Sequence, residues 1–193
     1  MDLSKLLIPG AVRVVGQLTS KKRLFQELGE LAASAYGMTG AVAVDGLQER
    51  ESLGPTGVGH GVALPHERLH GMSSVIGVFL RLEKALEFDA VDRQPVDLFL
   101  ALFGPNYSGV EHLKALALVS RTMRSAETCA KLRANTDPSA LHALGQRPAQ
   151  ALRLIHRPAG QGRRLGRTGL WGRTHHPKRS RSAATSSRNS DAA

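Results

Sequence analysis

Short runs of apolar residues separated by turn-forming residues predict a set of β-strands along the chain. The run at 75–82 is almost continuously apolar, as in a strand buried on both faces. Residues 86–88 alternate as a half-buried strand does, and the most apolar run ends at Gly104-Pro105-Asn106. The predicted strands are residues 12–15, 62–64, 75–82, 86–88 and 96–103.

Between these runs, apolar residues recur with the spacing of amphipathic helices. Ser20 is placed to cap a helix of about 16 residues that closes at Gly37, and Thr39 can cap a second helix that runs to about Arg50. Asp137-Pro138 provides an N-cap followed by a proline in the first turn. The predicted helices are residues 21–36, 39–50, 110–124, 127–133 and 138–145.

Helices therefore precede and follow the strands, which predicts an α/β fold: a β-sheet flanked by helices on both faces. The segment from 86 to 103 has the pattern of a hairpin, with turn chemistry between residues 89 and 95. A hairpin pairs its strands antiparallel, so we expect a mixed sheet rather than a purely parallel one.

Charge divides the 193-residue chain into two parts, although its overall composition (41% hydrophobic, 22% charged) is that of an ordinary globular protein. Residues 1–145 carry 15 Lys+Arg and 15 Asp+Glu, whereas residues 146–193 carry 11 Lys+Arg and a single acid. The whole net charge of +10 thus falls after Gly145. We expect one domain at 1–145 and a basic, disordered tail at 146–193.

The tail permits two interpretations. Its arginines, for example Arg163-Arg164 and Arg179-Ser180-Arg181, could form an electrostatic arm for nucleic acid, which predicts salt-dependent binding that disappears on truncation. Alternatively, the tail is an unstructured extension without selected function, produced by translation in another reading frame. The abrupt change of composition favours the extension, so nucleic acid is not the expected partner.

Several classes of protein are disfavoured by what the sequence lacks. No apolar run approaches the roughly 18 residues of a membrane span, and the N-terminus lacks the features of a signal peptide. Cys129 is the only cysteine, which rules out a disulfide framework. We expect a cytoplasmic protein that does not insert into membranes.

The stretch from Arg50 to His66 is the strongest candidate for chemistry. Its glycines leave backbone N–H groups accessible, as an anion-binding loop requires. His66 follows at the end of the run, and an imidazole that titrates near neutrality can act as a base, a metal ligand or a nucleophile. A metal site of His60, His66 and His70 is disfavoured, because no acidic or cysteine ligand stands at a suitable spacing.

Three blocks, in order, resemble the enzyme IIA domains of the phosphotransferase system, of the mannitol/fructose and nitrogen-regulatory type. The resemblance covers about residues 3–144 and favours nucleophile as the role of His66. The blocks are Arg50-Glu51 with Gly54-Pro55-Thr56-Gly57-Val58-Gly59-His60-Gly61-Val62-Ala63-Leu64-Pro65-His66, then Leu86-Glu87-Phe88-Asp89-Ala90 with Gln94-Pro95-Val96-Asp97-Leu98, then Glu111-His112-Leu113-Lys114-Ala115-Leu116-Ala117.

The resemblance implies that His66 accepts a phosphoryl group from a phosphohistidine carrier of the HPr kind, and that His112 steadies the phosphohistidine. Such transfer needs an in-line nucleophile and stabilised charge on the phosphoryl oxygens, but no metal or organic cofactor. We expect Arg50 to supply positive charge. The Thr56 hydroxyl and the backbone N–H groups of a phosphate loop should receive the oxygens. That loop is Gly57, Gly59 and Gly61.

Each residue also has a structural alternative: a buried histidine for His66, a solvated helix end for Arg50, a turn for Thr56 and partial core burial for His112. Two positions depart from the family, which often has serine at Pro55 and asparagine at His60. Pro55 removes a backbone donor, and a role for His60 in phosphate binding is doubtful.

These observations favour a phosphoryl carrier whose phosphorylation state changes which regulatory proteins bind the face around His66. No sugar permease or second phosphotransfer domain is fused to the chain, which favours the nitrogen-regulatory branch. The alternatives are a separate IIA subunit for mannitol- or fructose-type uptake, a nucleic-acid-binding regulator that uses the tail, and an interaction domain with an inactive histidine.

Overall fold

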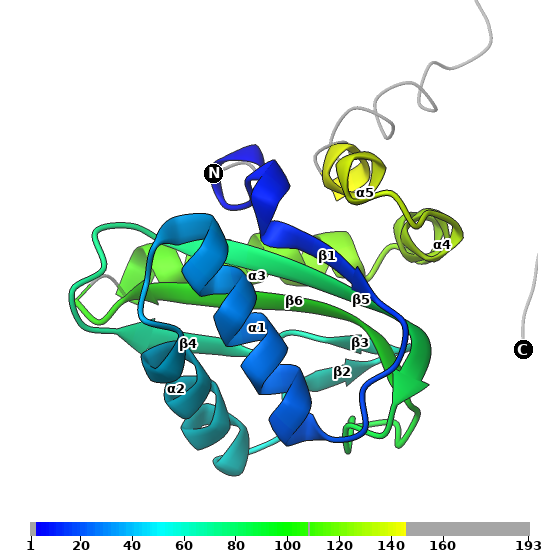
Figure 1. The fold of residues 1–193 in the computed structure, drawn as a ribbon, viewed down its shortest axis with the longest axis horizontal. Helices are drawn as coiled ribbons and strands as arrows, with labels where there is room; N and C mark the ends of the chain where they lie inside the picture. Colours follow the sequence, from blue (N-terminus) through cyan, green and yellow to red (C-terminus); the bar gives the residue numbers. More distant parts are fainter. Residues whose placement is uncertain (1–2, 108, 146–193) are drawn as a thin grey trace, which may run out of the picture. The chain divides into compact units, whose positions relative to one another are not determined.

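The computed structural model describes residues 3–107 and 109–145, so the predicted tail lies outside the described residues. Within them, 3-10 turns η1 (Leu3–Lys5) and η2 (Pro9–Ala11) precede the first strand. A mixed six-stranded sheet with helices on both of its faces follows (Figure 1). This confirms the α/β fold and the mixed sheet expected from the sequence.

The strands are short at the edges of the sheet and long in its centre. They lie in the order β1-β5-β6-β3-β2, and β4 follows β3 along the same side of β6. β5 and β6 are antiparallel, as the hairpin pattern predicted, and so are β2 and β3. β1 runs parallel to β5, and β3 and β4 run parallel to β6. Their bounds are β1 (Val12–Val15), β2 (Gly57–Gly59), β3 (Val62–Ala63), β4 (His66–Leu69), β5 (Ile76–Leu86) and β6 (Val96–Pro105).

The five predicted helices form, with ends within two residues of those expected. Ser20 caps the first by accepting from the backbone N–H of Arg23, and Gly37 ends it in the left-handed conformation at φ 70°. Thr39 precedes the second helix without a side-chain cap. Their bounds are α1 (Lys21–Tyr36), α2 (Gly40–Ser52), α3 (Gly109–Met123), α4 (Ala126–Ala134) and α5 (Pro138–Gly145).

Three strand predictions need correction. The runs at 75–82 and 86–88 are not two strands, because β5 continues to Leu86 and Phe88 turns into the core between Phe25 and Phe99. β2 forms where we expected only a loop, and β4 was not predicted. Neither strand has an apolar pattern of its own: β2 pairs with the two-residue β3 in a hairpin, and β4 pairs with the long β6. Local sequence therefore gives little signal for them.

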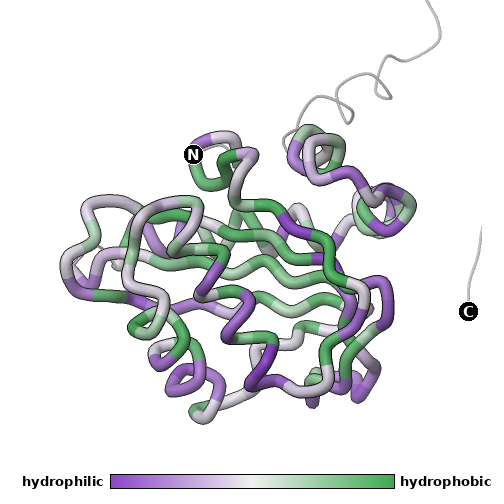
Figure 2. Tube along the Cα trace, in the orientation of Figure 1, coloured by the Kyte–Doolittle hydropathy of each residue, from purple (hydrophilic) through white to green (hydrophobic). Residues whose placement is uncertain are grey.

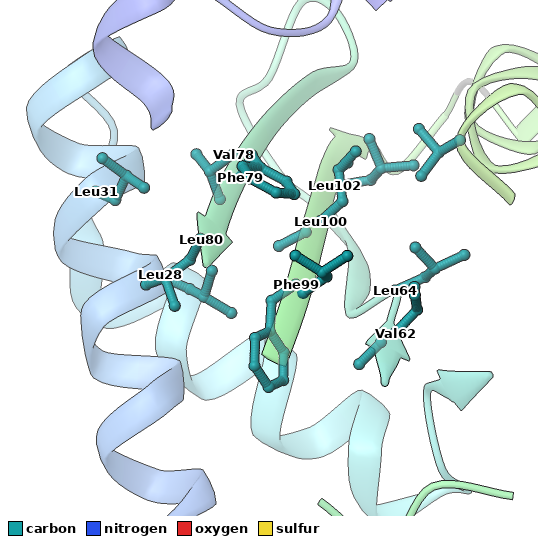
Figure 3. Close-up of a cluster of buried hydrophobic side chains, with 14 of the residues drawn as sticks. Leu28, Leu31, Val62, Leu64, Val78, Phe79, Leu80, Phe99, Leu100 and Leu102 are labelled. Carbon is teal, nitrogen blue, oxygen red and sulfur yellow. The ribbon is translucent and has the colours of Figure 1, made fainter. Parts of the chain in front are cut away.

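The core lies on both faces of β6, whose residues are buried except at Asp97. Figure 3 shows Leu28 and Leu31 of α1 pointing toward the strands on one face. In Figure 2 the strands are mostly hydrophobic, while the helices alternate between hydrophobic and hydrophilic positions. Burial on both faces makes β6 a rigid support, and the side chains of the candidate site are arranged along it.

Candidate functional site

His66 opens β4, directly after the break between β3 and β4. It pairs with Leu102 of β6, so its side chain projects from the same face of the sheet as that residue, toward α3. Its Nδ1 lies 2.9 Å from the carbonyl oxygen of Leu64. A carbonyl only accepts hydrogen bonds, so Nδ1 must carry the proton. Nε2 is therefore the nitrogen with the free lone pair.

Arg50 approaches that lone pair from the last turns of α2. Its Nε donates to Nε2 of His66 at 3.2 Å, and its Nη1 donates to the carbonyl of Gly54 at 3.1 Å. The guanidinium is always protonated, so its contact with Nε2 assigns the same tautomer independently. Among the described residues Arg50 makes no ion pair, and its charge remains available to an anion placed at Nε2.

His112, in the first turn of α3, lies beside His66, with ring centroids 5.8 Å apart. Its side chain is buried, and its Nδ1 has no hydrogen-bond partner among the described residues. The ring sits over Gly104 of β6, where a Cβ atom would come within 2.6 Å of Nδ1. A glycine inside an apolar strand often marks such a close approach, so Gly104 carried a signal that we read only as a strand end.

Both imidazoles are neutral at pH 7. Burial lowers the pKa of His66, the charge of Arg50 acts in the same direction, and the hydrogen bond to Leu64 partly opposes them. Burial lowers the pKa of His112 to about 4, and the neighbouring His66 and Arg68 contribute to the same shift. A neutral imidazole at His66 is the form that can attack an electrophile.

Thr56 lies close to the site, but its hydroxyl already donates a hydrogen bond to another side chain. The side chain is buried, and Oγ1 donates to Oε2 of Glu51 at 2.6 Å, while the Thr56 N–H donates to the same oxygen at 3.0 Å. Contact with a phosphoryl oxygen would require the hydroxyl to leave Glu51. The sequence interpretation missed Glu51, although it stands beside Arg50 in the first family block.

The expected phosphate loop lies elsewhere. Gly57 and Gly59 belong to β2, and the turn at His60-Gly61 leads back into β3. Val62 pairs with Leu98 whereas His66 pairs with Leu102. Four residues of β6, or about 13 Å, therefore separate the turn from the nucleophile.

The glycines of this hairpin serve close packing instead. A Cβ atom on Gly57 would meet Ala90 at 2.7 Å, one on Gly59 would meet Asp92 at 3.1 Å, and one on Gly61 would meet Arg133 at 2.5 Å. Gly59 and Gly61 also adopt positive φ angles of 94° and 75°. The structure thus places Gly57, Gly59 and Gly61 in a tight β-hairpin.

Arg68 was also missed. It lies two residues after His66 in β4, on the same face, and its exposed side chain makes no hydrogen bond or ion pair within the described part of the chain. Alternation along a strand could have suggested it, but the strand itself was not predicted. Arg68 adds positive charge on the side of His112.

His60, His66 and His70, which the sequence analysis disfavoured as a metal site, do not come together. Across residues 3–107 and 109–145, no group of three or more His, Cys, Asp or Glu side chains is placed to hold a metal ion. His60 belongs to the distant hairpin turn, and His70 contacts Asn106. In the same part of the chain, none of the helices has the length and apolar character needed to cross a bilayer.

Comparisons with known proteins show the family. Residues 6–146 match the family model of the phosphoenolpyruvate-dependent sugar phosphotransferase system, EIIA 2. The chain is 39% identical over 144 residues to a nitrogen regulatory protein of Bradyrhizobium diazoefficiens, which covers 75% of this chain and 94% of the relative. A nitrogen regulatory protein of Escherichia coli is 37% identical over 135 residues, covering 69% and 83%.

Solved structures show the same fold. The nitrogen regulatory protein IIA-Ntr from Neisseria meningitidis has a TM-score of 0.69 and 31% identity, over 74% of this chain and 98% of that one. The mannitol IIA of Escherichia coli has a TM-score of 0.61 over 72% of this chain and 98% of that one, and at 17% identity it shares the fold. The chain belongs to the EIIA type-2 family of the phosphoenolpyruvate-dependent sugar phosphotransferase system.

Proposed function

We propose that this protein is a phosphoryl carrier in which His66 accepts a phosphoryl group from a phosphohistidine protein of the HPr kind. The observation that carries the proposal is the fixed tautomer: Leu64 holds the proton on Nδ1, and the lone pair of Nε2 faces a guanidinium. Nε2 forms the new P–N bond as the P–N bond of the donor breaks, and the electron pair of that bond returns to the donor imidazole. The proton on Nδ1 stays in place.

Arg50 has two successive roles in this proposal. Before transfer its N–H group donates to Nε2, and this contact keeps that nitrogen unprotonated. During transfer it moves from the nitrogen to the phosphoryl oxygens, because a guanidinium binds such oxygens better than a neutral ring. His112, whose ring lies beside His66, donates a hydrogen bond to the transferred group. Both residues act by stabilising the charge on the phosphoryl oxygens, which is what phosphoryl transfer requires of a protein.

The output of the carrier is regulatory. Relatives that match nearly all of the described chain carry the name nitrogen regulatory protein, which supports this branch over sugar uptake. Phosphorylation adds nearly two negative charges at an exposed edge of the sheet, which would repel an acidic partner and attract a basic one. A sugar permease encoded beside the gene would favour the alternative, a separate uptake subunit.

Phosphoryl transfer from a phosphorylated HPr-type donor, read by intact mass under non-acidic conditions, tests the proposal. We expect one added phosphate on the wild type, none on His66→Ala, and one on the matched control His70→Ala, which removes an exposed histidine four residues away. A competent donor that leaves the wild type unmodified would overturn the proposal, and so would phosphate on His66→Ala.

A further inference from the structure

Glu51 is a buried carboxylate beside the proposed nucleophile that the mechanism above does not use. It stands at the end of α2, next to Arg50, and only 8% of its side chain is exposed. Burying a carboxylate is costly unless its oxygens are well bonded. Here both oxygens accept hydrogen bonds: one partner precedes Glu51 in the sequence and the other follows it.

The first oxygen connects α2 with α1. Oε1 of Glu51 receives Nζ of Lys21, from the first turn of α1, at 3.3 Å. Lys21 is itself fixed, because its ammonium also pairs with Asp89 at 2.9 Å and lies 4.7 Å from the centroid of the Phe88 ring. The carboxylate is therefore tied to the first turn of α1 as well as to the loop after α2.

The second oxygen leads to the nucleophile. Oε2 receives both donors of Thr56, and the carbonyl of Thr56 accepts the backbone N–H of Leu64 at 2.9 Å. Pro65 restricts Leu64 to extended conformations, so fixing the N–H of Leu64 also directs its carbonyl. That carbonyl receives Nδ1 of His66.

We propose that Glu51 is a positioning residue: by clamping Thr56, it places the Leu64 carbonyl that holds His66 in the tautomer with a proton on Nδ1. The effect on phosphoryl transfer rests on the proposed function, whereas the effect on the tautomer does not. Thr56 belongs to the same chain of contacts and acts through Leu64, rather than by touching phosphate.

The chemical consequence follows from the two nitrogens of a neutral imidazole, which share one proton. When the Leu64 carbonyl shifts away, the hydrogen bond that favours a proton on Nδ1 weakens. Arg50 at Nε2 still favours the proton on Nδ1, but a larger fraction of His66 than in the wild type then carries its proton on Nε2, where no lone pair remains for attack. Weakening the clamp should therefore slow the chemical step while leaving the docking of the donor protein unchanged.

Two-bond ¹H–¹⁵N correlation spectra of the full unphosphorylated chain test the tautomer directly. The His66 ring signals are assigned among the eight histidines by their loss in His66→Ala. We expect a pyrrole-like Nδ1 and a pyridine-like Nε2 in the wild type, and averaged shifts in Glu51→Ala and Thr56→Val. Thr56→Ser restores the hydroxyl donor and should return the wild-type pattern.

The matched control is Glu27→Ala. Glu27 of α1 is a carboxylate of similar burial (13% exposed) that is paired with Arg13 of β1 and Arg23 of α1. Within the described part of the chain, no hydrogen bond or ion pair of Glu27 leads to His66. The Glu27→Ala variant should lose stability as Glu51→Ala does, but its His66 should keep the wild-type tautomer. If Glu51→Ala fails to fold, Thr56→Val still decides the question, because it removes only one hydroxyl from the clamp.

Transfer kinetics from the phosphorylated donor complete the test. We expect kcat to fall about tenfold or more in Glu51→Ala and Thr56→Val, with KM for the donor unchanged. Wild-type tautomer and rate in both variants would overturn the inference, as would equal effects in Glu27→Ala. A wild type that accepts no phosphate but loses its tautomer in Glu51→Ala would refute the proposed function and support the inference.

Discussion

The run from Arg50 to His66 is continuous in the sequence, but the fold divides it between two ends of one sheet edge. At one end, Arg50 and His66 meet His112 from α3. At the other end, the hairpin turn at His60-Gly61 meets residues of β6, α4 and the loop before β6. Both ends contain histidine, arginine and glycine, yet their polar groups are used in opposite ways.

At the hairpin end, charges are matched. Arg133 donates through Nε and Nη2 to both carboxylate oxygens of Asp97, at 2.6 and 2.7 Å, and Nη2 also reaches the carbonyl of His60. The N–H of His60 donates to Asp92 at 2.8 Å. Such bidentate pairing leaves little capacity for a ligand and serves to hold the hairpin in place.

At the His66 end, bonding capacity is left over. Arg50 donates to a neutral ring rather than to a carboxylate, and one nitrogen of His112 has no partner within the described residues. Keeping buried polar groups under-bonded costs stability, and it is most readily explained by a ligand that completes them. The comparison teaches that spare hydrogen-bonding capacity, rather than glycine content, distinguishes the reactive end from the structural one.

The largest effect should come from Arg50→Gln, which removes the charge facing Nε2. Loss of one preorganised donor to a transition-state oxygen costs on the order of 100-fold in rate, so we expect a fall of about that size in transfer from the donor. The matched control is Arg68→Gln, which removes an equal charge from the face of β4 that carries His66 and should change the rate by only a few fold. Equal losses in both variants would mean that overall positive charge, not the contact at Nε2, matters.

The next largest effect concerns stability, and it comes from His112. Its pKa of about 4 in the folded protein lies below the 6.5 of an unfolded chain, so between these values only the unfolded state binds the proton. The contribution of neutral His112 to the free energy of unfolding is therefore complete above pH 6.5, and it decreases as the pH falls toward 4. The shift corresponds to about 3 kcal/mol.

Urea unfolding of the wild type and of His112→Gln at pH 7, 5.5 and 4.5 measures this contribution. Glutamine does not titrate, so the variant should lose less stability on acidification than the wild type does. Parallel loss in the two proteins would contradict the assignment of this pH dependence to His112.

A smaller effect on stability is expected at the hairpin end. Arg133→Gln breaks the pair with Asp97, which is partly exposed, so we expect a loss of about 1–2 kcal/mol in the free energy of unfolding. The rate of phosphoryl transfer at a temperature where the variant is folded should equal that of the wild type. A large fall in rate would show that the hairpin end takes part in the reaction after all.

The smallest effect should come from His60→Gly. His60 adopts a left-handed conformation at φ 56°, which a residue with a Cβ atom adopts at a cost. Glycine removes this cost but adds freedom to the unfolded chain, so the net gain should be about 0.5 kcal/mol. Thermal unfolding measures it. A marked loss of phosphoryl acceptance in this variant would contradict the purely structural role of the turn.

Local patterns in the sequence predicted much of the fold because the forces behind them are local. Ser20 and Gly37 bound α1 as expected, since capping hydrogen bonds and a left-handed C-terminus depend on a few neighbouring residues. The strands β1, β5 and β6 were also found, because they bury enough apolar side chains to leave a pattern. β4 was not predicted because its backbone pairs with β6, more than 30 residues away, and β2 was not predicted because its three residues leave no apolar pattern.

The sequence by itself determined the order of most elements, the family and the nomination of His66, Arg50 and His112. Only the tertiary structure decided which groups meet. The register along β6 separated the glycine hairpin from His66, and the clamp from Lys21 through Glu51 and Thr56 joins segments 30 residues apart. The reason is physical: hydrogen bonds depend on distance and direction in space, and packing against a shared central strand sets both.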